Sequence, residues 1–261
     1  MIADLHNHTP LCNHAEGSMF EYIEKAIESG TQYFGFSDHA PMDYDLKYRM
    51  KFEDMKTYEQ DVKSAKKKYQ GKIEILLGYE VDWLPNHMDE RVLTADVDYL
   101  IGSVHFLEGW GFDNPEFIGD WESQDIDEIW QKYFDTIEDM ANSKLFDIVG
   151  HLDLIKVFKY MPKGNINNMA NNALQAIKNA GMVLEINGAG FRKPVKEAYP
   201  SKSLLKQAFD LEIPITFSSD AHKPEQVSMF ADETLKLAKE VGYTECVVFK
   251  KRQKKFINFE C

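Results

Sequence analysis

Residues 2–39 read IADLHNHTPLCNHAEGSMFEYIEKAIESGTQYFGFSDH, and this stretch holds two short apolar runs, 2–5 and 33–37, on either side of an amphipathic segment. The segment opens with Ser18 and with Glu21 three residues later, which is the pattern of a capping box, and it closes at Gly30. Its apolar residues recur at the spacing of one helical face. The stretch therefore predicts a strand, a helix and a second strand, the repeating unit of a parallel α/β fold.

The same alternation continues to the end of the chain. Further apolar runs of strand length lie at 73–78, 99–104, 147–150, 183–186, 215–218 and 246–249. Amphipathic segments that predict helices lie at about 52–69, 126–141, 169–180, 203–211 and 232–241. No linker, low-complexity tract or internal repeat interrupts the pattern, so we expect a single domain over residues 1–261. Seven or eight such units predict an α/β protein closed into a TIM-like barrel.

Composition limits the class of function. The chain has 261 residues and a formal net charge of −13, which disfavours a nucleic-acid partner because such binding depends on Lys and Arg. The basic run at 250–255 is short, and we expect it to be a solvated face. No apolar stretch has the length of a signal peptide or a membrane span, so we expect a cytoplasmic protein with no membrane partner. The sequence leaves the oligomeric state open.

Residues that bind metals follow the predicted strands at their C-terminal ends. They are His6 and His8 after the first run, His39, Glu80, His105 and His151 after the second to fifth runs, and Asp220 with His222 after the run at 215–218. In a parallel barrel all these ends meet on one face, where catalytic groups gather. His14, in the loop after the first run, is expected to reach the same face. His87 falls in a predicted loop outside the pattern, and we expect it to be structural.

The number of candidate ligands indicates more than one metal ion. Cys12, Cys246 and Cys261 are too few and too scattered for a disulfide framework or a CxxC zinc site, so imidazole and carboxylate must hold any metal. A catalytic first-row ion takes about three protein ligands, which predicts two to three ions of Zn, Mn or Fe. The candidate set is His6, His8, His14, His39, Glu80, His105, His151, Asp220 and His222.

Two positions within this set have a clear physical logic. His6 and His8 can grip one ion, because side chains two apart on an extended backbone point to the same side. Asp4 shares their face and could be a further ligand, but we expect it instead to accept the proton on the second nitrogen of a ligand. Glu80 is the expected bridge between ions, since a carboxylate offers two oxygens whereas an imidazole offers one free nitrogen.

The motifs that carry these residues resemble those of the polymerase and histidinol phosphatase (PHP) superfamily. They are DLHNH (4–8), SDH (37–39), GYE (78–80), GSVH (102–105), GH (150–151) and SDAH (219–222). The stretches GSVHFLEGWGFDNPEF (102–117), HLDLIK (151–156) and EINGAGFRKPVKEAYPS (185–201) resemble the histidinol-phosphate phosphatases in particular. The resemblance implies a distorted seven-stranded (β/α) TIM-like barrel that hydrolyses L-histidinol phosphate to L-histidinol and phosphate in histidine biosynthesis.

The resemblance also implies how the ligands divide among the ions. One ion takes His6, His8, Glu80 and Asp220, a second takes Glu80, His105 and His151, and a third takes His14, His39 and His222. In this scheme Glu80 and Asp220 are catalytic through the ions that they hold.

Hydrolysis of a phosphate monoester needs a nucleophile at neutral pH and stabilisation of charge on the phosphoryl oxygens, and clustered cations supply both. Arg192 is the candidate for a bidentate contact to the phosphate, and Lys156 is either a weaker point charge or a surface lysine. Asp38 is a candidate proton donor to the leaving group or, alternatively, a structural carboxylate. The candidate contacts to the amino-imidazole end of the substrate are Glu108, Trp110 and Asp113.

Other functions stay open on the sequence alone. A PHP-type phosphoesterase could act on a different small phosphate monoester. An amidohydrolase-type barrel also opens with HxH and ends with an aspartate, but it usually bridges its metals through a lysine on a strand, and it gives His14 no role. A non-catalytic metal-binding or regulatory module is disfavoured by the full ligand set. A nuclease of the same superfamily is disfavoured by the absence of a basic stripe.

Overall fold

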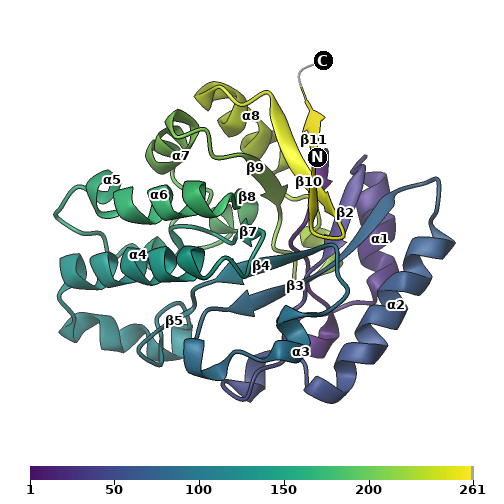
Figure 1. The fold of residues 1–261 in the computed structure, drawn as a ribbon, viewed down its shortest axis with the longest axis horizontal. Coiled ribbons are helices and arrows are strands. Elements are labelled where there is room, and N and C mark those ends of the chain that lie inside the picture. Colours follow the sequence, from purple (N-terminus) through teal and green to yellow (C-terminus); the bar gives the residue numbers. More distant parts are fainter. Residues whose placement is uncertain (260–261) are drawn as a thin grey trace.

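Seven parallel strands form the centre of the protein in the computed structural model, which describes residues 1–259. Their order is β1 (Ala3–Asp4), β2 (Tyr33–Phe36), β3 (Glu74–Asp82), β4 (Tyr99–Ser103), β7 (Ile148–Val149), β8 (Val183–Asn187) and β9 (Ile215–Ser218). The backbone N–H of Leu5 donates to the carbonyl of Phe217 at 3.0 Å, which joins the two edge strands and closes the sheet on itself (Figure 1). The predicted seven-stranded β/α barrel is confirmed.

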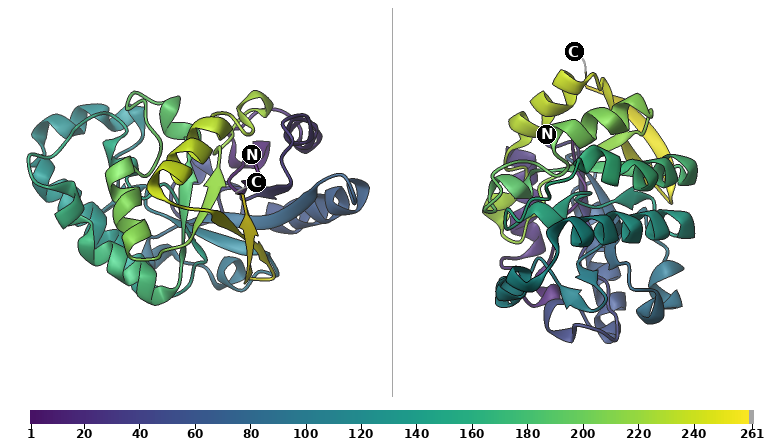
Figure 2. Two further views of the ribbon diagram at one scale, coloured as in Figure 1. Left: turned by 90° about the horizontal axis from the view of Figure 1, so that it is seen from above. Right: turned by 90° about the vertical axis from the view of Figure 1, so that its left-hand side faces the viewer.

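Helices connect the strands and cover the outside of the barrel (Figure 2). They are α1 (Met19–Glu28), α2 (Met55–Lys68), α3 (Glu90–Leu93), α4 (Ile126–Ser143), α5 (Ile166–Met169), α6 (Asn171–Ala180), α7 (Lys202–Asp210) and α8 (Ala231–Val241). The capping box predicted for α1 is present, because the Ser18 side chain accepts from the Glu21 N–H while the Ser18 N–H donates to the Glu21 carboxylate at 2.6 Å. Both interactions satisfy N–H groups that a helix start leaves unpaired.

Short 3-10 helices lie mainly in the loops at the strand ends. They are Pro10–Cys12, Leu46–Tyr48, Phe52–Asp54, Pro85–His87, Pro115–Ser123, Leu154–Lys156, Gly188–Phe191 and Pro224–Gln226. The longest of them follows a small antiparallel hairpin of β5 (Phe106–Leu107) and β6 (Trp110–Gly111). These loops build the wall around the carboxyl ends of the strands.

Tyr99 fills the interior of the barrel between β2 and β3. Its hydroxyl donates to the Leu5 carbonyl at 2.6 Å, so the polar end of the buried side chain is satisfied. Gly78 makes room for its ring, since a Cβ at that position would lie 2.5 Å from a ring carbon of Tyr99. The packing around Tyr99 is dense, so position 78 has no room for a side chain.

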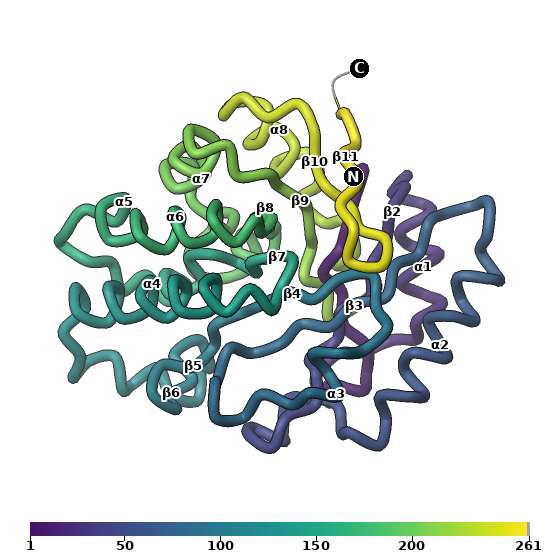
Figure 3. Tube along the Cα trace, in the orientation of Figure 1, coloured from purple at the N-terminus to yellow at the C-terminus, as the bar shows by residue number. Residues whose placement is uncertain are grey.

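The expected strand at 246–249 forms, but it does not enter the barrel. Strand β10 (Glu245–Lys250) pairs antiparallel with β11 (Gln253–Asn258). The chain enters this hairpin directly after α8 (Figure 3). At the turn, Lys251 and Arg252 donate backbone N–H bonds to Asp98, at 3.2 and 2.8 Å. Asp98 directly precedes β4, so the hairpin is fastened to the amino-terminal end of the barrel.

Two further observations complete the description of residues 1–259. None of their helices is long and apolar enough to span a membrane. Cys12 and Cys246 are buried free thiols, and Cys261 lies outside the described residues.

Candidate metal centre

The predicted ligands lie at the carboxyl ends of the barrel strands, and the structure brings them together on one face. The set comprises His6, His8 and His14 after β1, His39 after β2, Glu80 in β3, His105 after β4, His151 after β7, and Asp220 with His222 after β9. His87 takes no part, because its Nδ1 pairs with Asp43 at 2.6 Å in an exposed loop.

Glu80 lies at the middle of this cluster and is almost completely buried. Its Oε2 is 3.2 Å from His6 Nε2 and 2.9 Å from His39 Nδ1. Its Oε1 is 3.1 Å from His151 Nε2 and 3.7 Å from His105 Nε2. The two oxygens therefore face two separate groups of imidazoles, which is the arrangement that a bridging carboxylate needs.

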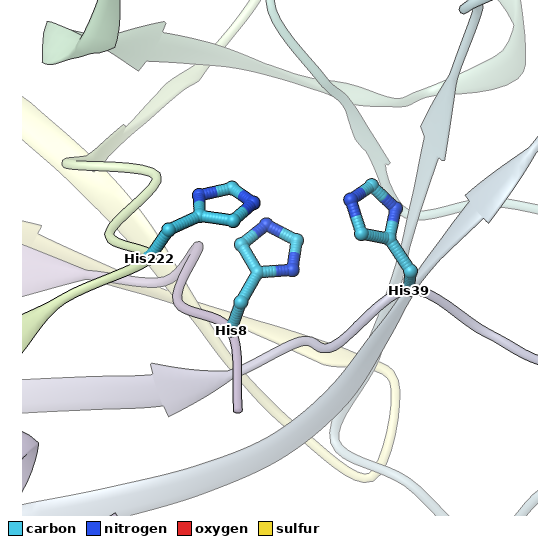
Figure 4. Close-up of side chains that lie close together, drawn as sticks. All are labelled: His8, His39 and His222. Atoms are coloured by element: carbon cyan, nitrogen blue, oxygen red, sulfur yellow. The ribbon is translucent and has the colours of Figure 1, made fainter. Parts of the chain in front are cut away.

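Four groups of side chains have ligand atoms that all lie within 4.8 Å of one another: one is His8, Cys12 and Asp38, and the other three consist of predicted ligands. These three are His6, His8 and Glu80; Glu80, His105 and His151; and His8, His39 and His222. Figure 4 shows the three rings of the last group reaching toward one another from separate segments of the chain. The first group contains three of the four ligands that the resemblance implied for one ion, without Asp220, and the second group has the composition implied for another. In the third, His8 stands where that division placed His14.

His14 reaches the same cluster through His222. The Nδ1 of His14 lies 2.9 Å from the Cys12 carbonyl, and the Nδ1 of His222 lies 3.2 Å from the Asp220 carbonyl. Because a carbonyl only accepts, each Nδ1 carries the proton and each Nε2 is left with a lone pair. These two Nε2 atoms are 3.0 Å apart, a repulsive arrangement that a cation would relieve.

The protonation states favour a cation. Burial alone would lower the pKa of His6, but the Glu80 and Glu185 carboxylates raise it well above its ordinary value. Burial alone would raise the pKa of Glu80, but imidazoles led by His6 hold it well below its ordinary value. Burial and the neighbouring His39 and His8 rings lower the pKa of His14 to about 4. The ionised Glu80 and the neutral His14 are therefore in the forms that bind metal, whereas His6 would have to release its proton to an ion.

Several buried atoms of the cluster make no well-aligned hydrogen bond, although some of them lie within ion-pair distance of a ligand side chain of opposite charge. They are Nε2 of His6, Nε2 of His8, Oε2 of Glu80 and Nδ1 of His151. Buried polar atoms in proteins are nearly always paired, so unpaired atoms that converge in this way need an explanation. Imidazole and carboxylate donors aimed at a common centre fit divalent transition-metal ions.

Glu185, on β8, orients two of the ligands. Its Oε1 lies 2.7 Å from His6 Nδ1, and its Oε2 accepts the backbone N–H of His151 at 2.7 Å. With Nδ1 bound in this way, His6 presents Nε2 to the cluster. The sequence analysis did not single out this residue. The signal available was a carboxylate in an otherwise apolar strand run.

Asp82 orients His105 in the same manner. Its Oδ1 lies 2.5 Å from His105 Nδ1, and its Oδ2 accepts from Arg49 Nη2 at 3.0 Å. The sequence analysis missed both Asp82 and the buried Arg49. Asp82 follows Glu80 by two positions on one strand, so the alternation of a strand could have placed it on the same face.

Asp38 is enclosed by the protein next to His8. Its Oδ1 lies 3.3 Å from His8 Nδ1 and accepts the backbone N–H of His39 at 3.0 Å, and the Thr9 hydroxyl donates to its Oδ2. Asp38 does not line the cavity described below. Of its two predicted roles, this geometry favours the structural carboxylate that positions His8.

Asp4 has a different task from the one expected. Its carboxylate accepts the N–H of Ser219 at 2.8 Å, the hydroxyl of Ser219 at 2.7 Å and the N–H of Ser228 at 2.8 Å. None of its described hydrogen bonds goes to a histidine. Asp4 therefore ties β1 to the loops that follow β9, where the barrel closes.

A cavity of about 560 Å³ opens above the cluster. Arg192 lines it, with Nη2 donating to the carbonyls of Ser219 and Asp220 at 2.9 Å each, while its buried Nη1 has no partner. Asp113 also lines the cavity. Both residues are therefore placed where a bound substrate would lie.

Three other predicted substrate contacts do not line this cavity. The buried Lys156 ammonium lies 2.9 Å from Asp153 and 3.0 Å from Glu197, and it donates to the Ala198 carbonyl at 2.8 Å. These partners use all three of its donors. Glu108 is 84% exposed and lies 3.6 Å from Lys132. Trp110 packs edge-on against Trp121.

A parallel β/α barrel that gathers imidazoles around an ionised, buried carboxylate below an open cavity is a metal-dependent hydrolase. The family model described as the PHP domain matches residues 4–189. The chain belongs to the PHP domain family, as the sequence motifs predicted, and this membership displaces the amidohydrolase-type alternative.

Relatives of known name resemble the chain over almost all of its length. It is 39% identical to the "Probable histidinol-phosphatase" of Deinococcus radiodurans, over 92% of this chain and 94% of that protein. It is 29% identical to the "Histidinol-phosphatase" of Bacillus subtilis, over 84% and 93% of the two chains. The crystal structure of histidinol phosphate phosphatase from Lactococcus lactis, complexed with zinc, L-histidinol and phosphate, has the same fold, with a TM-score of 0.83 at 21% identity over 97% of this chain and 98% of that one.

Proposed function

We propose that the protein is a histidinol-phosphatase, a metal-dependent phosphomonoesterase that hydrolyses L-histidinol phosphate to L-histidinol and phosphate in histidine biosynthesis. The observation that carries the proposal is the cavity, which joins the His and Glu cluster to an unpaired guanidinium nitrogen of Arg192. The names of the relatives that match nearly the full chain support the same substrate.

The ions proposed for this site number two to three and are Zn, Mn or Fe. His6, His8, Glu80 and Asp220 would hold one, Glu80, His105 and His151 a second, and His14, His39 and His222 a third, with His8 also within reach of that group. Bound ions would supply a water with a lowered pKa and would neutralise charge on the phosphoryl oxygens. The zinc in the Lactococcus lactis structure supports zinc among these metals.

The residues of the chain itself bind and orient the ester. Arg192 is held by two backbone carbonyls, so its free Nη1 points at a fixed place and can bind a phosphoryl oxygen without reorganisation. Glu80, ionised and gripped by imidazoles from both sides, keeps the two halves of the cluster at a fixed separation. These fixed positions are what a reaction driven by charge stabilisation requires.

Asp113 is the proposed contact for the leaving group. It lines the cavity, and a carboxylate attracts the ammonium and the imidazole that L-histidinol phosphate offers. A simple aryl phosphate has neither group. Asp113 would thereby select the substrate without taking part in bond cleavage.

Phosphate release from a panel of monoesters, measured on metal-reconstituted protein, tests this proposal. We expect kcat/KM for L-histidinol phosphate to exceed that for 4-nitrophenyl phosphate and for nucleotides. Asp113→Asn should reduce kcat/KM for L-histidinol phosphate and leave the aryl phosphate nearly unaffected. Equal cleavage of all esters by the unmodified protein would refute the named substrate and leave a PHP-type phosphoesterase of another monoester. No phosphate release from any ester would refute the phosphatase.

A further inference from the structure

Tyr199 is a buried tyrosine whose hydroxyl has no hydrogen-bond partner. Other buried tyrosines of this protein are paired: Tyr58 donates to the Gly78 carbonyl at 2.9 Å, and Tyr243 donates to the Ile213 carbonyl at 2.9 Å. A buried hydroxyl without a hydrogen-bond partner lowers the free energy of unfolding. Such groups are therefore rare in proteins, and each one needs an explanation, for instance a role in binding. Tyr199 lines the cavity above the metal centre, which suggests what the use is.

The side chain is held in a fixed position on the cavity wall. The backbone of Tyr199 exchanges two hydrogen bonds with Asn187, the last residue of β8, at 2.7 and 3.0 Å. The Lys156 ammonium lies 5.3 Å from the ring centroid, and the ring of His151 meets it edge-on at 6.4 Å. Lys156 thus supports this wall in place of the phosphate contact predicted for it.

A second unpaired donor lies in the same cavity. Arg192 uses Nη2 on the carbonyls of Ser219 and Asp220, and its Nη1 is buried without a partner. Tyr199 and Arg192 therefore offer one O–H and one N–H to whatever fills the cavity beside the metal ligands His151 and Asp220. A transferring phosphoryl group spreads its charge over three equatorial oxygens, and it needs donors of this kind on the side away from the ions.

We propose that the Tyr199 hydroxyl donates a hydrogen bond to a phosphoryl oxygen of the substrate, next to the oxygen bound by Arg192. This inference rests on the proposed phosphatase function and adds a catalytic residue to it. The phenol donates a hydrogen bond and keeps its proton. The leaving alkoxide must therefore obtain its proton elsewhere.

Tyr199→Phe, assayed with two esters, separates this role from that of a general acid. A lost hydrogen bond to a charged oxygen should lower kcat/KM by roughly ten- to a hundredfold, and equally for L-histidinol phosphate and 4-nitrophenyl phosphate, since both present the same phosphoryl group. A general acid would matter far more for the alkyl ester, because nitrophenolate leaves without protonation. A loss confined to L-histidinol phosphate, or no loss with either ester, would overturn the proposal.

Two further measurements do not depend on turnover. Binding of inorganic phosphate to metal-loaded protein should weaken by roughly ten- to a hundredfold in Tyr199→Phe. The melting temperature should stay the same or rise, because the substitution removes an unpaired buried hydroxyl.

Tyr243→Phe is the matched control, since Tyr243 is buried, paired and outside the cavity. It should lower the melting temperature and leave phosphate binding unchanged. A Tyr199→Phe variant with a lowered melting temperature and normal phosphate binding would show that Tyr199 has a structural role instead. If the unmodified protein hydrolyses no ester, the proposed function fails, and phosphate binding still decides the role of Tyr199.

Discussion

Glu80 has an electrostatic environment that few carboxylates share. It is buried, which disfavours its charge, yet His6, His39 and His105 hold its pKa well below the ordinary value. The charge on this residue is therefore essential to the arrangement of the rings around it. A neutral side chain of the same shape would remove the attraction and leave the imidazoles facing one another.

Glu80→Gln is expected to lower kcat by about a hundredfold or more, the effect of losing a major preorganised charge. Gln keeps the shape of the side chain but presents one amide nitrogen, which cannot bind a cation. Metal content measured on the purified variant should fall together with activity. Turnover near that of the unmodified enzyme, with full metal content, would remove Glu80 from the bridging position.

Asp82 fixes the orientation of His105 by binding the Nδ1 of its ring. With His105 Nδ1 bound to Asp82, and Asp82 in turn bound to the buried Arg49, the ring presents Nε2 to the cluster. Asp82→Asn should weaken metal affinity by roughly ten- to a hundredfold, as found for such outer partners of metal ligands. Competition against a chelator measures this directly.

Asp147→Asn provides the control for that experiment. Asp147 is a partly buried carboxylate that pairs with Arg252 at the far end of the barrel. Its substitution should destabilise the fold and leave the chelator competition unchanged. Equal metal affinity in Asp82→Asn and the unmodified protein would show that the orientation of His105 does not depend on Asp82.

Among single residues, the sequence predicted the side chains that cluster at the carboxyl ends of the strands better than the residues that position them. Most of the histidines could be placed because they follow an apolar run, and parallel strands end on one face. The role of Lys156 could not be predicted, because one of its partners, Glu197, is distant in the sequence and is brought close only by the fold. An isolated lysine carries no sign of such a partner.

Among elements, the C-terminal hairpin differs most from the expectation, because the strand at 246–249 pairs with β11 and not with the barrel. Lys251 and Arg252 form its two-residue turn with φ values of +49° and +64°, a conformation that usually takes Asn and Gly. Without those residues the turn could not be recognised, although the basic run at 250–255 is mostly exposed, as expected of a solvated face. The 3-10 helix Pro115–Ser123 likewise has no counterpart among the predicted helices. Its fold depends on Trp121 stacking against the distant Tyr160.

Lys251→Asn should stabilise the protein, because Asn tolerates positive φ better than Lys does. The expected gain in the free energy of unfolding is at most about 1 kcal/mol, the size of the left-handed penalty. Urea denaturation checks it. Arg252→Gly relieves the same kind of strain but loses the bond from Arg252 to the Leu145 carbonyl at 2.7 Å, so it should be neutral or destabilising. A destabilised Lys251→Asn would mean that the turn is unstrained.

At the level of the whole molecule, the alternation of apolar runs and amphipathic segments was sufficient to predict the barrel. Each apolar run was short enough for a buried strand and each intervening segment was amphipathic, so one closed sheet could bury all of them. The closure itself was hidden from the sequence. It depends on Asp4 reaching Ser219 and Ser228, contacts between opposite ends of the chain. A charged residue on the first strand reads as a candidate ligand until its partners are known.

The same closure links the stability of the fold to the metal centre, because the ligands come from the first strand, the last barrel strand and most of those between. Ions that bind only the folded chain stabilise it by about 2.7 kcal/mol when free metal is a hundredfold above the dissociation constant. For a chain of this size that corresponds to a rise in melting temperature of roughly 5–10 °C. We therefore expect chelation to lower the melting temperature by that amount and added Zn or Mn to restore it. Glu80→Gln should respond much less. Buried ligand atoms on so many strands must stabilise the folded state when they bind a cation. A melting temperature independent of chelator and of added metal would therefore contradict a metal centre built from these residues.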